Sequence, residues 1–94
     1  MPTITFHLEA QLRRLAGGST VSLDIDQETT LAQALQLLAK RSPDVANYLV
    51  TEDGSISRSL LIAVDEENVS ATEAAHRQLE RDSTVVLLPP ISGG

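Results

Sequence analysis

Segments with the pattern of β-strands stand near both ends of the chain, and this arrangement constrains the fold more than any other feature of the sequence. Residues 3–8 and 21–26 alternate polar and apolar side chains, and residues 84–88 are rich in β-branched side chains. An alternation with a period of two places every second side chain on one face of a sheet. These segments are therefore predicted to be strands, and the first two should each have one buried face.

One long helix is predicted between the strand segments. Apolar residues between positions 31 and 39 recur at the i, i+3, i+4 and i+7 spacing of an amphipathic helix. Thr29 or Thr30 stands where a helix cap is needed, and Pro43 disfavours a helical residue before it. A shorter helix is predicted over residues 9–16, where the period of the apolar residues also becomes helical.

The second half of the chain is less regular. The continuous apolar run at residues 60–64 predicts a fully covered strand, and residues 65–70 are predicted to be a polar turn. A further helix is predicted over residues 72–81, where Ala75 and Leu79 have helical spacing.

This order of elements predicts an α+β fold of the β-grasp (ubiquitin-like) type. The sheet should be mixed, with four to five strands and one long helix packed on one face. The first and last strands should lie side by side and parallel in the middle of the sheet. The 94 residues are enough for one domain, which we place at residues 1–88, followed by an extended tail at residues 89–94.

Composition excludes several classes of function. The net charge of −6 argues against binding to nucleic acids or to anionic membranes, which require clustered Lys and Arg. The chain has no cysteine, no apolar run long enough to span a membrane and no signal peptide near Met1. We therefore expect a cytoplasmic protein that contacts neither nucleic acid nor membrane.

Neither a metal site nor a cofactor site is predicted within the chain. His7 and His76 have no second ligand at metal-binding spacing, and Gly17 and Gly18 lack the pattern of a phosphate-binding loop. Any ATP chemistry must therefore be supplied by a partner.

The tail carries the clearest functional signal. It consists of Pro89, Pro90, Ile91, Ser92, Gly93 and Gly94. Prolines cannot donate to a sheet ladder and favour an extended conformation, whereas terminal glycines fit a channel too narrow for any Cβ atom. The α-carboxylate of Gly94 is thus unhindered, and an enzyme that adenylates it would make it an acyl donor. We predict that Ile91, the one large apolar residue of the tail, anchors it in a partner.

Residues 85–94 resemble the C-terminus of the small subunit of molybdopterin synthase, which belongs to the ubiquitin-like sulfur carriers together with the thiamine-pathway carrier. Residues 10–17, 30–35 and 60–65 are similar to other parts of that family, so the resemblance covers nearly the whole chain. One departure is Asp65, where the family usually has Asn.

The resemblance implies that this chain supplies sulfur from its own terminus. An E1-like enzyme would use ATP and magnesium to adenylate Gly94, and a sulfur donor would convert it to a thiocarboxylate. The tail would then enter the large subunit of molybdopterin synthase or another sulfur acceptor enzyme. We expect a monomer alone and a hetero-oligomer with the partner. The residues implied in partner contact are Leu88, Pro89, Pro90, Ile91, Ser92, Gly93 and Arg13.

Four apolar residues exceed what one covered sheet face requires. They are Leu60, Ile62, Leu87 and Leu88. Their number predicts an exposed apolar patch for partners, although each one taken singly is expected to pack in the core.

Other functions use the same terminus. Residues 52–58 resemble carriers that deliver sulfur for cysteine synthesis, and a carrier for thiamine synthesis is a further alternative. A ubiquitin-like modifier joined to lysines of other proteins would need the same activated carboxylate. In a plain β-grasp interaction domain the diglycine would be incidental.

Overall fold

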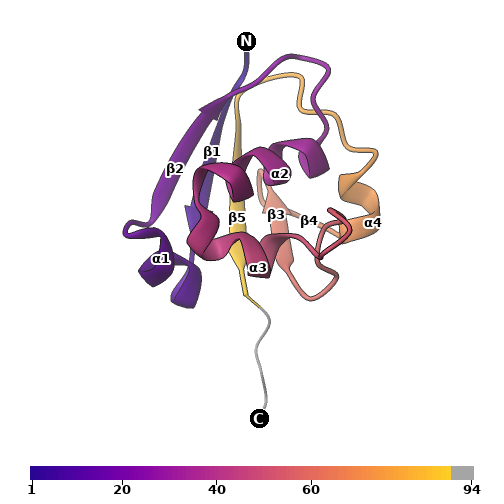
Figure 1. Ribbon diagram of the computed structural model, residues 1–94. Coiled ribbons are helices and arrows are strands. Elements are labelled where there is room, and N and C mark those ends of the chain that lie inside the picture. Colours follow the sequence, from indigo (N-terminus) through magenta and orange to yellow (C-terminus); the bar gives the residue numbers. More distant parts are fainter. Residues whose placement is uncertain (90–94) are drawn as a thin grey trace.

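A five-stranded mixed sheet forms the centre of the protein, with the strand order β2-β1-β5-β3-β4 (Figure 1). The structure is a computed structural model that describes residues 1–89. The strands are β1 (Thr3–Leu8), β2 (Thr20–Asp24), β3 (Leu61–Val64), β4 (Glu67–Val69) and β5 (Ser83–Leu88).

The two central strands, β1 and β5, come from opposite ends of the chain and run parallel. Ile4 lies opposite Ser83 and Leu8 lies opposite Leu87. β2 pairs antiparallel with β1, and β3 pairs antiparallel with both β5 and β4. Because parallel neighbours cannot be joined by a tight turn, a long crossover lies between them, and its helix packs on the sheet. The β-grasp prediction, including the parallel central pair, is confirmed.

The long helix α2 (Leu31–Arg41) covers one face of the sheet (Figure 1). It begins with a capping box, in which the Thr30 hydroxyl accepts from the Gln33 N–H at 3.2 Å and the Gln33 side chain accepts from the Thr30 N–H at 2.9 Å. The capping box thus supplies acceptors to two backbone N–H groups that would otherwise lack them, and this fixes the start of the helix. The other helical segments are α1 (Ala10–Ala16), the 3₁₀ turn η1 (Pro43–Val45), α3 (Ala46–Leu49) and α4 (Ala71–Ala74).

The core lies between α2 and the sheet. Ile4, Phe6 and Leu8 of β1 are fully buried, which confirms the buried face predicted from the alternation of polar and apolar residues. The helix contributes its predicted apolar stripe of Leu31, Ala34, Leu35, Leu38 and Ala39. Burying a large aliphatic or aromatic side chain stabilises a fold by about 1.5–3 kcal/mol, so this layer holds α2 on the sheet.

Residues 67–69 form strand β4, so the prediction of a polar turn over 65–70 is wrong there. The turn is confined to Asp65 and Glu66, both of which have positive φ, at 47° and 74°. Two such residues in succession make a tight hairpin turn, which returns the chain so that Val69 pairs with Ile62. Val69 is buried, and this burial favours a strand despite its polar neighbours.

Helix α4 ends at Ala74, so the helix predicted over residues 72–81 is wrong beyond this point. The chain pairs instead with the segment before α2. The Leu31 N–H donates to the Arg77 carbonyl at 2.8 Å, and the Leu79 N–H donates to the Thr29 carbonyl at 2.9 Å. These tertiary hydrogen bonds bury Leu79 in the core, which a continued helix would not achieve.

Candidate functional site

The face of the sheet opposite α2 is open and has two chemically different halves. On β1 and β2 it presents the polar residues Thr3, Thr5, His7, Thr20, Ser22 and Asp24. On β3 and β5 it presents Leu61, Ala63, Val86 and Leu88, which we call the apolar patch. Antiparallel sheets with one open face normally place polar residues there, so the apolar patch needs an explanation beyond folding.

Strand register brings the apolar patch together. Leu61 lies directly opposite Leu88, and Ala63 lies opposite Val86. Leu61 is 50% exposed and Leu88 is 39% exposed. The prediction that β3 is fully covered is therefore wrong, because α2 covers only the face to which Ile62 and Val64 belong.

A groove of about 800 Å³ runs over the apolar patch toward the edge of the sheet. Its floor is formed by side chains of β3 and β5, and its far wall by Asn68, Val69 and the start of α4. Arg58 and Glu73 place one charge of each sign on its rim. The groove thus combines an apolar floor with a polar rim, which is typical of protein docking surfaces.

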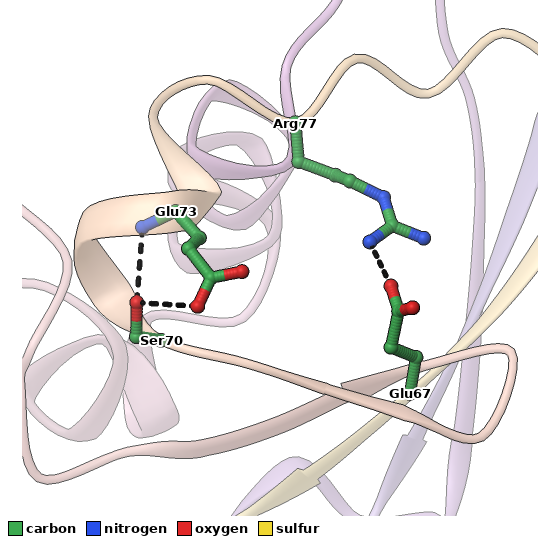
Figure 2. Close-up of polar contacts among 4 residues, drawn as sticks. All are labelled: Glu67, Ser70, Glu73 and Arg77. Carbon is green, nitrogen blue, oxygen red and sulfur yellow. Dashed lines mark hydrogen bonds and ion pairs between the residues drawn. The ribbon is translucent and has the colours of Figure 1, made fainter.

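Two contacts hold the outer wall of this groove (Figure 2). The Ser70 hydroxyl caps α4 by accepting from the Glu73 N–H at 3.1 Å, and it also donates to the Glu73 carboxylate at 3.1 Å. An ion pair between Arg77 and Glu67 joins the chain after α4 to β4. Both partners are more than a third exposed, so the pair adds only about 0–1 kcal/mol of stability.

The tail leaves the body beside the apolar patch. β5 ends at Leu88, which belongs to the patch, and the half-buried Pro89 follows. The expectation that proline stops the ladder agrees with this strand end. The other predicted tail residues lie outside the described residues: Pro90, Ile91, Ser92, Gly93 and Gly94.

Helix α1 lies at the same end of the molecule as the end of β5 (Figure 1), and Arg13 belongs to this helix. α1 adjoins the end of β5, since the Glu9 N–H before it donates to the Leu87 carbonyl at 3.1 Å. The helix then ends at Gly17, whose φ of 75° is the left-handed conformation that glycine adopts readily. The exposed Arg13 makes no side-chain hydrogen bond or ion pair within residues 1–89. Its predicted role in partner contact stays a prediction.

Of the four surplus apolar residues identified in the sequence, Leu88 is exposed and the other three are buried. Leu60, Ile62 and Leu87 are at most 4% exposed and belong to the core. Sequence reasoning missed Leu61, the most exposed member of the patch. The run at residues 60–64 is apolar throughout, so its periodicity gives no sign of which side chains face outward.

The histidines do not form a metal centre in the described part of the chain. His7 lines a shallow depression with Glu9, Asp65 and Glu66, whereas His76 lies exposed beyond α4. Residues 1–89 contain no group of three or more His, Cys, Asp or Glu side chains arranged to hold a metal ion. Within the same residues, the helices are too short or too polar to cross a membrane.

The sheet topology, the long covering helix α2 and the strand that leads into the tail define a ubiquitin-like β-grasp protein. The chain belongs to the ThiS family, which it matches over residues 6–94. It is similar to small archaeal modifier protein 1 of Haloferax volcanii, with 30% identity over 87 residues, which is 93% of this chain and 95% of that protein.

Solved structures agree with this assignment. The crystal structure of SAMP1 from Haloferax volcanii superposes with a TM-score of 0.84 at 25% identity and covers 98% of this chain and 99% of that one. A putative molybdopterin converting factor, subunit 1, from Pyrococcus furiosus has a TM-score of 0.75 at 18% identity, with 97% and 100% covered, and shows the shared fold. The sequence resemblance is thus confirmed at the level of the family of ubiquitin-like carriers and modifiers.

Proposed function

We propose that this chain is a sulfur carrier whose reactive group is the terminal carboxylate of Gly94. An E1-like partner binds ATP and magnesium and transfers AMP to this carboxylate, with release of pyrophosphate. A sulfur donor then displaces AMP and leaves a thiocarboxylate on Gly94. An acceptor enzyme takes the sulfur, and the tail resemblance favours the large subunit of molybdopterin synthase in that role.

The observation that carries this proposal is the position of the apolar patch. Leu61 and Leu88 are exposed at the point where β5 passes into the tail. A partner that covers the patch would receive the tail directly, because five residues beyond Pro89 reach about 17 Å when extended. The body would then provide docking, and the tail would provide the reacting atom.

A modifier function is the second candidate. It is favoured by the 30% identity to a protein named a small archaeal modifier protein. The first step would be the same adenylation of Gly94, and a lysine amine of another protein would then take the place of the sulfur donor. Carriers for cysteine or thiamine synthesis differ from the molybdopterin proposal only in the acceptor enzyme.

Intact mass spectrometry of the chain purified from its own host tests the proposal. A carrier will show a fraction in which one terminal oxygen is replaced by sulfur, whereas a modifier will appear in conjugates with other proteins. A variant that lacks Gly94 should show neither and should keep its fold. A chain that carries only an ordinary carboxylate and forms no conjugates would contradict both candidates.

A further inference from the structure

Lys40 is the only lysine of this chain, whose other six basic residues are arginines. A guanidinium group stays protonated at all physiological pH values and does not act as an acyl acceptor. Lys40 therefore holds the one side-chain amine that an activated carboxyl group could acylate. An acidic chain with an acyl-donor terminus thus carries a single internal acceptor.

The structure places this amine on the solvent side of α2. Leu35 and Leu38 of the same helix face the core, whereas Lys40 is exposed. Its side chain makes no hydrogen bond or ion pair in the described part of the chain, in which the one ion pair is that of Arg77 with Glu67. The Lys40 amine is thus accessible from solvent.

Lys40 also lines an open depression of about 450 Å³ on the outer side of α2. Leu37, which is 45% exposed, supplies an apolar contact there. Asp26 and Glu28, from the loop before α2, line the same depression. The depression thus contains an amine, an apolar surface and two carboxylates.

We propose that Lys40 is the acceptor for the activated Gly94 of a second copy of this chain. This inference rests on the proposed activation of Gly94. The Lys40 ammonium first gives one proton to water, and the neutral Nζ atom then attacks the acyl carbon of the Gly94 adenylate, so that an amide bond forms and the bond to AMP breaks. AMP leaves with the electron pair, and the second proton lost by Nζ also passes to water.

The depression suits the incoming tail. Ile91 is the one large apolar residue of the arriving segment, and Leu37 offers it an apolar contact beside the amine. Gly93 and Gly94 have no side chain that would obstruct approach to Nζ. Because each copy has one internal acceptor and one donor terminus, the product is an unbranched chain of copies linked through Lys40.

The test compares tagged wild-type chain with Lys40→Arg, each expressed in its natural host and purified under denaturing conditions. The wild type should form a ladder of covalent multimers. Trypsin should then release a branched peptide in which residues 82–94 are attached to Lys40 within residues 15–41. Lys40→Arg keeps the positive charge and should abolish both the ladder and the branched peptide. A ladder that persists in this variant would overturn the proposal.

A matched control tests the position of the amine. The double variant Lys40→Arg with Arg41→Lys moves the only lysine by one residue, which rotates it about 100° around α2. The ladder should stay absent, because the amine has left the depression. A ladder restored at position 41 would show that any amine on this helix suffices, and would overturn the role assigned to the depression.

Failure of this inference is distinguishable from failure of the proposed function. If Gly94 appears as a thiocarboxylate, or in conjugates with other proteins, but no branch forms on Lys40, then activation stands and self-acylation is wrong. If Gly94 is never modified in the wild type, both proposals are wrong.

Discussion

The two halves of the open sheet face differ in a way that folding alone does not require. Both halves face solvent and belong to one sheet, yet the half on β1 and β2 is polar, whereas the half on β3 and β5 exposes Leu61 and Leu88. Exposed apolar side chains add little to the stability of the free protein, but they contribute strongly to binding affinity when a partner covers them. The polar half is therefore what an uncovered sheet face normally shows, and the apolar patch is the surface on which the proposed function places a partner.

Substitutions on the covered face of the sheet should lower the stability of the protein most strongly. Phe6→Ala removes the chain's one phenylalanine, which is fully buried, and should lower the free energy of unfolding by about 3–5 kcal/mol. Thr5→Ala, one residue along on the open polar half, should change it by about 0.5 kcal/mol or less. Urea denaturation of both variants checks this contrast. Equal losses would show that the two faces of β1 are not distinguished by burial.

The two open halves should respond differently in binding. Leu61→Asp should weaken affinity for the host's activating enzyme about tenfold or more, which corresponds to about 1.4 kcal/mol, because a charge replaces an apolar contact. Ser22→Asp places the same charge on the polar half and should leave the affinity within about twofold. Isothermal titration calorimetry measures both.

The outcome that contradicts this prediction is a Ser22→Asp variant that loses as much affinity as Leu61→Asp. In that case, the whole open face, or its net charge, would control binding. Circular dichroism spectra of the two variants provide the control for folding.

A substitution at the start of α2 should lower the free energy of unfolding less than a substitution in the core beneath the helix. Thr30→Ala removes the hydroxyl of the capping box and should cost about 1 kcal/mol, because the Gln33 N–H loses its acceptor. Thermal unfolding followed by circular dichroism checks this value. Thr29→Ala is the control, since the Thr29 side chain takes no part in the capping box. A comparable loss in both variants would locate the effect outside the cap.

The smallest expected effect is a pH dependence. Hydrogen bonds from the Thr51 hydroxyl and from the Ser55 N–H lower the pKa of the exposed Asp53 below its ordinary value of 3.8. A carboxyl group with a lowered pKa in the folded state stabilises the fold above about pH 3.8, and this contribution disappears as the pH falls through the folded-state pKa. Asp53→Asn should therefore flatten a small part of the acid-induced decrease in Tm. If Asp53→Asn leaves the dependence of Tm on acidic pH unchanged, this prediction is contradicted.

Local sequence signals were sufficient for the elements that obey a simple period. The burial of Ile4, Phe6 and Leu8 and the stripe of α2 both follow from periodicity. The sequence left both Thr29 and Thr30 as candidates for the cap, and the structure assigns the cap to Thr30. The turn at residues 65 and 66 was predicted, but the strand at residues 67–69 was not predictable in this way. Asp65 and Glu66 have positive φ although neither is glycine, so nothing in the sequence confines the turn to two residues.

The site was only partly predictable for a related reason. The tail can be recognised from its residues, because the Pro-Pro and Gly-Gly pairs act through local backbone chemistry. The apolar patch depends on register: Leu61 becomes part of it only because it pairs with Leu88 across two strands that are far apart in sequence. No local pattern encodes that pairing, and a shift of one residue would exchange the buried and exposed sets.

The most direct test of the central claim, that a partner docked on the apolar patch activates Gly94, is ATP–pyrophosphate exchange by the host's activating enzyme with this chain as substrate. We expect exchange with the wild type, slower exchange with Leu61→Asp at subsaturating concentration, and none with a variant that lacks Gly94. Exchange that continues at the wild-type rate without Gly94, or that never occurs with the wild type, would contradict it.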